Sequence, residues 1–90
     1  MRVSMSPKAE ELLRLAREKG LRVVVGRDYV DVGGLVVKRV REYRCAWYSE
    51  KRIYSVYVYV VGKRRFRRLW EAVRFAVLAK LRELVWHARR

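Results

Sequence analysis

The sequence predicts an α+β fold in which an antiparallel sheet follows an N-terminal helix and precedes a long C-terminal helix. Three observations predict it: a helix-start signal at Ser6-Pro7, short Val- and Tyr-rich runs between turn signals over residues 21–61, and an apolar pattern of helical period from residue 64 onward. The expected order is α-β-β-β-β-α, with four strands. Ninety residues support one modest core, so we expect residues 1–90 to form a single domain.

The first helix is expected over residues 7–19. Ser6 can cap its free N–H groups, and Pro7 is tolerated at a first helical position because that N–H needs no partner. Glu10 and Glu11 lie near the positive end of the helix dipole. Gly20 then supplies the stop.

Four strands are expected over residues 21–25, 29–32, 35–48 and 53–61. Gly33-Gly34 is a strong hairpin signal because the tight turns of hairpins need positive φ at their centre. The apolar pattern of the third strand changes phase near residues 38–41, which predicts a bulge or a bend. Gly62 leads into the final helix, expected over residues 64–88.

Positive charge is concentrated in the middle of the chain. The formal net charge is +14, and residues 35–70 hold eleven Lys and Arg against two Asp and Glu. Such an excess attracts polyanions, and nucleic acid is the first candidate. Five of these cations form a run at the expected start of the final helix, where the dipole disfavours cations unless an anion meets them. They are Lys63, Arg64, Arg65, Arg67 and Arg68.

The last hairpin is expected to carry a binding face. If Glu50-Lys51 centres the turn, one face carries Tyr43, Cys45, Trp47, Tyr54, Val56, Val58 and Val60, and we expect this face to join the core. The other face then presents Arg44, Tyr48, Tyr57 and Tyr59. Tyrosines beside cations suit base stacking combined with phosphate neutralisation. The alternative is that Tyr57 and Tyr59 cover a second helix or a subunit interface.

The final helix carries apolar residues on two sides. A core-facing stripe runs from Phe66 through Leu84 to Ala88, and a second stripe lies on the opposite side. One stripe suffices for a monomer, so the second predicts a homo-oligomer, a dimer or a tetramer. The residues expected at that interface are Phe75, Leu78, Ala79 and Trp86.

Enzyme hypotheses find little support in the sequence. His87 stands alone, and Asp28 and Asp31 would point to opposite faces of a strand, so we expect no catalysis, no metal and no cofactor. The single Cys45, the absence of a signal-peptide pattern and the absence of a long apolar run favour a cytoplasmic protein without a membrane partner. The lack of Asn, Gln and Thr fits a hyperthermophile.

The layout resembles a known archaeal family. A helix, a sheet with Tyr57 and Tyr59, the basic junction KRRFRR and a long terminal helix are similar to the ThermoDBP-related single-stranded DNA-binding proteins. The resemblance implies single-stranded DNA held by aromatic and basic residues, and self-association. We therefore expect a sequence-nonspecific single-stranded DNA-binding protein. The alternatives are an RNA-binding protein, either ribosome-associated or like the double-stranded RNA-binding domain, and a chromatin-like duplex binder.

Overall fold

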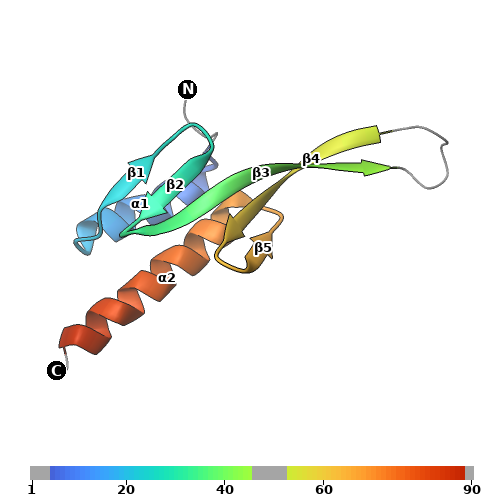
Figure 1. The fold of residues 1–90 in the computed structure, drawn as a ribbon. Coiled ribbons are helices and arrows are strands. Elements are labelled where there is room, and N and C mark those ends of the chain that lie inside the picture. Colours follow the sequence, from blue (N-terminus) through green and yellow to red (C-terminus); the bar gives the residue numbers. More distant parts are fainter. Residues whose placement is uncertain (1–4, 46–52, 89–90) are drawn as a thin grey trace.

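The computed structural model describes residues 5–45 and 53–88, which form two helices and a five-stranded antiparallel sheet (Figure 1). The predicted α+β class is confirmed, whereas the prediction of four strands is wrong by one. The strands are neighbours in chain order, as in a meander. The elements are α1 (Pro7–Glu18), β1 (Val23–Val25), β2 (Tyr29–Val32), β3 (Leu35–Cys45), β4 (Ile53–Val61), β5 (Arg64–Phe66) and α2 (Leu69–Ala88).

Both helices contribute to one core on one face of the sheet. In Figure 1, α1 lies behind β1 and β2, so the view is from the side that the helices leave open. The core is built mainly from alanine and valine, with a few leucines, and the small alanines let the helices pack closely. Its members include Ala9, Leu13 and Ala16 of α1, Val30, Val32, Val37 and Val61 of the sheet, and Leu69, Ala72, Val73, Ala76 and Val77 of α2.

The start of α1 follows the sequence signal. The Ser6 hydroxyl accepts a hydrogen bond from the Ala9 N–H at 3.3 Å, which satisfies one of the free donors of the first turn. Gly20 adopts a φ of 89° directly after the helix, a conformation that costs glycine little. The predicted first helix is therefore confirmed, ending at Glu18.

The Gly33-Gly34 hairpin is also confirmed. The two glycines have φ values of 58° and 95°, and they connect β2 to β3. The Asp31 carboxylate accepts a hydrogen bond from the Gly34 N–H at 2.8 Å and so holds the turn. The turn fixes the register in which Val30 and Val32 point into the core opposite Val37 and Leu35.

The register of the β3–β4 hairpin corrects two predictions. Arg41 pairs with Tyr57 and Tyr43 with Ser55, three residues away from the predicted pairing. An odd shift exchanges the faces, because side chains alternate along a strand. Pairing is one to one from Lys38 to Cys45, so the predicted bulge at residues 38–41 is absent.

The start of the final helix is a further correction. After a turn at Gly62, where φ is 58°, residues Arg64–Phe66 pair with β4 as a fifth strand, and α2 begins only at Leu69. Pairing with β4 gives these residues backbone partners without a helix. The basic run is therefore distributed over a turn, a strand and the approach to α2.

Candidate nucleic-acid interface

The outer part of the β3–β4 hairpin projects from the body of the molecule (Figure 1). We call residues 39–45 and 53–59 the arm. Nearer the helices, the inner face of these two strands carries the buried Val37 and Val61. By strand alternation, the same face of the arm carries Arg39, Arg41 and Tyr43, paired with Tyr59, Tyr57 and Ser55. The change from valine to Arg and Tyr coincides with the loss of helix cover.

Tyr57 is held by two arginines. The Arg41 guanidinium donates a hydrogen bond from Nη2 to the Tyr57 hydroxyl at 2.6 Å. The guanidinium carbons of Arg39 and Arg41 lie 4.5 Å and 5.2 Å from the ring centroid, within cation–π range. The hydrogen bond from Arg41, with smaller contributions from the charges of both arginines, lowers the pKa of Tyr57. The cluster fixes the position of this ring without burying it.

Arg39 also joins the arm to the body. Its Nη2 donates to Asp28 Oδ1 at 2.8 Å, and its backbone N–H donates to the Asp28 carbonyl at 2.8 Å. The hydrogen bond with Asp28 is the main reason that the pKa of Arg39 is raised. Since a carboxylate already neutralises this guanidinium, we assign Arg39 to positioning Tyr57 rather than to binding an anion.

Two rings of the inner face of the arm remain open to solvent. Tyr43 is 71% exposed and Tyr57 is 42% exposed. Tyr59, at the base of the arm, is half-buried and packs against the core. The two outer rings can receive a flat ligand such as a base, whereas Tyr59 can offer only part of its surface.

A groove of about 750 Å³ lies where the arm meets the body. Its wall combines the Met5–Lys8 segment at the start of α1, Tyr59, and residues 67–70 at the start of α2. The cations among its lining residues are Lys8, Arg67 and Arg68, and none of the lining residues is acidic. The groove is therefore positively charged, and two aromatic residues, Tyr59 and Trp70, also line it.

The same groove lies beside two helix N-termini. Lys8 is in the first turn of α1, and the Arg68 carbonyl accepts the first helical hydrogen bond of α2 from the Ala72 N–H at 3.3 Å. Helix N-termini attract anions, and within the described ranges no carboxylate forms an ion pair with Lys8, Arg67 or Arg68. Three unneutralised cations at two positive helix ends repel one another, and a bound anion would relieve that repulsion.

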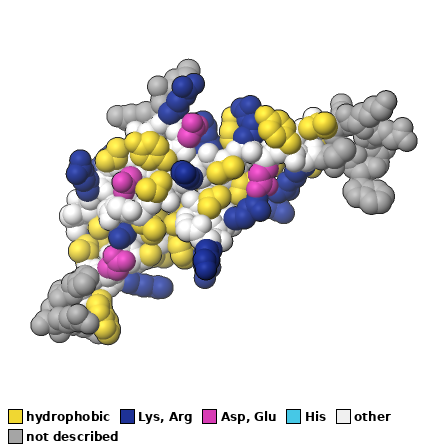
Figure 2. Space-filling model, viewed as in Figure 1, with side chains coloured by type: hydrophobic (Ala, Val, Ile, Leu, Met, Phe, Trp, Pro, Cys, Tyr) yellow, Lys and Arg dark blue, Asp and Glu magenta, His cyan; other side chains and the backbone are white. Residues whose placement is uncertain are grey.

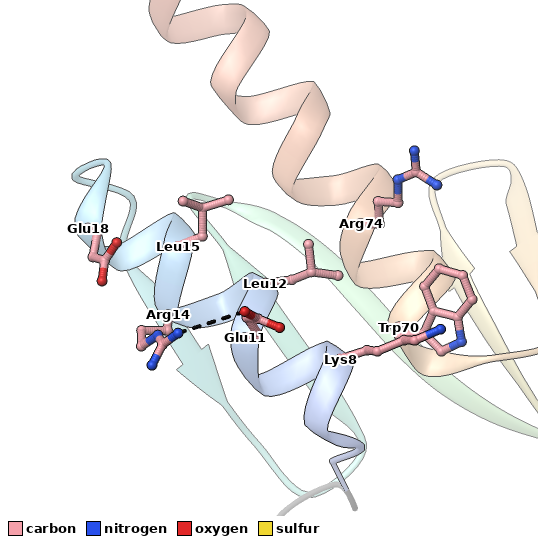
Figure 3. A pocket seen from close by; sticks show the side chains of 8 residues that line it. All are labelled: Lys8, Glu11, Leu12, Arg14, Leu15, Glu18, Trp70 and Arg74. Atoms are coloured by element: carbon pink, nitrogen blue, oxygen red, sulfur yellow. Dashed lines mark ion pairs between the residues drawn. The ribbon is translucent and has the colours of Figure 1, made fainter.

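Lys8 connects this groove to a second hollow, between the two helices. Figure 3 shows its side chain extending to Trp70, with the ammonium 4.7 Å from the ring centroid. The hollow has a volume of about 450 Å³, and Leu12 and Leu15 lie in it between α1 and α2. Trp70 lines both spaces, so the positive groove continues into a partly apolar one.

Two residues that were predicted to bind phosphate lie on the face of the sheet opposite to Tyr43 and Tyr57. Arg44 and Arg65 occupy the open face and both form ion pairs with Glu42, Arg44 at 3.6 Å. The prediction that Arg44 shares a face with Tyr57 and Tyr59 is therefore wrong, because it depended on the incorrect register.

The other four residues of the basic run do not share one site. Arg64 lies over the Phe75 ring at 5.0 Å, Lys63 is exposed in the turn before β5, and Arg67 and Arg68 border the groove. The five cations were expected at the strand-to-helix junction and in the first helical turns; they lie between β4 and α2, but none is inside α2, which begins at Leu69. Tyr48 lies outside the described residues.

The open face of the sheet is mainly apolar. Figure 2 shows hydrophobic side chains over the sheet, with Lys and Arg side chains around them. Val56, Val58 and Val60 lie on this face and not on the core face of the helices, although Val58 is itself buried among its neighbours. The prediction that these three valines face the helices is thus wrong because of the register, although Val58 is buried as expected.

The predicted interface residues of α2 differ in exposure. Leu78 is 43% exposed and Trp86 is also exposed, whereas Ala79 is half-buried. Phe75 packs on Phe66 at 5.5 Å between ring centroids and is partly covered, so it also supports the core. Leu84, expected in the core, is exposed. The helix therefore buries its first half more completely than its second.

Four residues of the site were missed by sequence reasoning: Lys8, Arg39, Arg41 and Tyr43. The last three lie on the same face as Tyr57 and Tyr59 in the observed register, which differs by three residues from the predicted one. Lys8 carries no such signal, because only the packing of α1 against the start of α2 brings it to the groove.

The described residues offer no group of three or more His, Cys, Asp or Glu that could hold a metal ion. Asp28 and Asp31 have structural partners instead, in Arg39 and in the Gly34 turn. Of the two helices described, neither is long and apolar enough to cross a membrane.

Comparison with known proteins adds no assignment. No family profile matches the chain, and searches of curated proteins and of solved structures return no significant match.

Proposed function

We propose that this protein binds single-stranded nucleic acid without marked sequence preference, with DNA expected ahead of RNA from the resemblance described above. The sugar-phosphate backbone of the nucleic acid follows the groove, where Lys8, Arg67 and Arg68 bind its phosphates. The bases stack on the inner face of the arm, on Tyr43 and Tyr57. The observation that carries the proposal is the gathering of three unneutralised cations at two helix N-termini, beside a face of exposed tyrosines.

Stacking is the reason for proposing single strands. Each exposed ring can receive a base only if that base is not already stacked inside a duplex, and such contacts contribute about 1–3 kcal/mol per base. Tyr43 and Tyr57 keep ring surface exposed. Arg39 and Arg41 cover part of the Tyr57 ring and hold it in position, so a base would stack on the part that stays exposed. A binder of duplex backbone would need cations but no exposed rings.

The test is fluorescence anisotropy with labelled oligonucleotides of equal length. Single-stranded DNA, single-stranded RNA, duplex DNA and duplex RNA are compared at two salt concentrations. We expect single strands to bind more tightly and to keep more of their affinity at the higher salt, because stacking is less sensitive to salt than ion pairing. Tighter binding of duplexes that collapses with salt would contradict the proposal.

Variants then locate the phosphate contacts. Replacing Arg67 and Arg68 by Gln should reduce the steepness of log affinity against log salt by about 1.4, or about 0.7 for each lost contact with a single strand. Arg65→Gln is the matched control for Arg68→Gln, because Arg65 is paired with Glu42 on the open face. If Arg65→Gln changed the slope as much as Arg68→Gln, the groove would not be the phosphate site.

A further inference from the structure

The solvent-facing side of α2 carries a stripe with heptad spacing. Glu71, Phe75, Leu78 and Arg82 follow one another at steps of four, three and four residues, and Val85 continues the series by three. These steps keep the side chains in one line along a helix, as at the a and d positions of a coiled coil. The buried residues Ala72, Val73, Ala76 and Val77 lie on the other side of the helix, against the sheet and α1. The stripe therefore points away from the core. It is exposed at Leu78, Arg82 and Val85, whereas Phe75 is partly covered by Phe66 and Arg64.

The stripe is hollowed as well as apolar. One depression of about 380 Å³ includes Glu71, Phe75 and Leu78 among its lining residues. A second, of about 280 Å³, includes Leu78, Arg82 and Val85. Leu78 is 43% exposed and Val85 is 55% exposed. Two adjoining depressions separated by one leucine can receive the side chains of a helix laid along α2.

The order of charges along the stripe indicates a second copy of the same helix as the partner, in antiparallel orientation. It begins with an acid, Glu71, and a base, Arg82, follows eleven residues later, with Phe75 and Leu78 between them. In an antiparallel pair of identical helices, Phe75 of each copy meets Leu78 of the other, and Glu71 of each copy meets Arg82 of the other. Within the described part of the chain, neither Glu71 nor Arg82 forms an ion pair. A parallel pair would instead place Glu71 against Glu71 and Arg82 against Arg82.

We propose that α2 pairs antiparallel with α2 of a second copy, about a twofold axis between Phe75 and Leu78, with two Glu71–Arg82 ion pairs across the interface. The contact is isologous, so both copies use the same surface and the assembly closes as a dimer. It does not depend on nucleic-acid binding. The same register brings Val85 of the second copy opposite Arg68, so each groove is bordered by the end of the other copy's α2.

The experiment is a charge exchange in the full chain, measured by sedimentation equilibrium without nucleic acid. Arg82→Glu should weaken dimerisation by roughly tenfold or more, because it replaces two ion pairs with two repulsions between acids. Glu71→Arg should weaken it by a similar factor. The double variant Glu71→Arg/Arg82→Glu restores both pairs with their signs exchanged, and its dissociation constant should return to within about threefold of the wild-type value.

Arg17→Glu is the matched control, because Arg17 is exposed on α1 and the substitution changes the net charge by the same amount. It lowers the charge of a strongly basic chain, so it should leave dimerisation unchanged or slightly stronger. Circular dichroism checks that each variant keeps its helices; should one single variant unfold, the other single variant and the double variant complete the test. A wild-type monomer through the micromolar range, a loss with Arg17→Glu equal to that with Arg82→Glu, or no recovery in the double variant would overturn the proposal.

Discussion

The two ends of the β3–β4 hairpin show how one pair of strands can serve two purposes. At the body, their inner face is closed by the helices and carries the buried Val37 and Val61. On the arm, the same inner face is not covered by the helices, and it carries Arg41, Tyr43 and Tyr57. The backbone pairing is continuous between them, so the difference lies in the side chains and in what covers them.

This difference separates residues that stabilise the fold from residues that can bind a ligand. A two-stranded ribbon alone is at best marginally stable in water, so the arm depends on the body and adds little to its stability. Its side chains can therefore be polar and aromatic at small cost to the fold. Substitutions in the body should change stability, and substitutions on the arm should change binding.

The largest expected effect is a loss of stability in the body. Leu13, on α1, is 3% exposed, and Leu13→Ala should lower the free energy of unfolding by about 2–5 kcal/mol through lost burial and a residual cavity. Leu15→Ala on the same helix is the control; Leu15 is 40% exposed, and its loss should cost at most about 1 kcal/mol. Urea unfolding measures both. Equal losses would mean that α1 contacts the sheet through a different face.

The next effect should appear in binding and compares the two faces of the arm. Tyr43→Ala, on the inner face, should weaken single-strand binding by about 1–3 kcal/mol while leaving the melting temperature nearly unchanged. Tyr54 is 47% exposed but lies on the open face, so Tyr54→Ala should leave affinity unchanged. Anisotropy and thermal melts of both variants provide the comparison. Equal losses of affinity would show that the nucleic acid does not bind preferentially to the inner face of the arm.

The smallest effect concerns the titration of Tyr57. The hydrogen bond from Arg41 favours the ionised ring, so Tyr57 should ionise at lower pH than an ordinary tyrosine, and Arg41→Gln should move its pKa back up. Stability from this contact is present above the pKa that Tyr57 has in the unfolded chain. The part of that stability that depends on ionisation of Tyr57 is lost as pH falls through the lowered pKa of the folded state. NMR of the tyrosine ring carbons against pH measures the shift, and an unchanged titration in the variant would contradict the contact.

The local signals of the sequence were sufficient for most of the fold. The Ser6-Pro7 cap, the Gly33-Gly34 turn and the helical period of the C-terminal part each depend on neighbours close in the chain. The cap and the turn appear where expected, and the helical period forms α2, although α2 begins at Leu69 and not at residue 64. The predicted cations at residues 67 and 68 also border the groove. Arg44 and Arg65 were also predicted to bind phosphate, but they do not border the groove. The predicted register was wrong by three residues and so placed Arg44 on the wrong face, and Arg65 lies in β5, a strand that was not predicted.

The sequence by itself determined an α+β chain with two helices, a meander of antiparallel strands and an excess of positive charge in its middle. These properties follow from caps, turns, periodicity and composition, all of which are local or additive. Only the tertiary structure decided which face of the arm carries Tyr43 and Tyr57, that Lys8 lines the same groove as Arg67 and Arg68, and that Arg65 is neutralised by Glu42. Strand register and helix packing depend on contacts between distant residues, and alternation turns a small error in register into an exchange of faces.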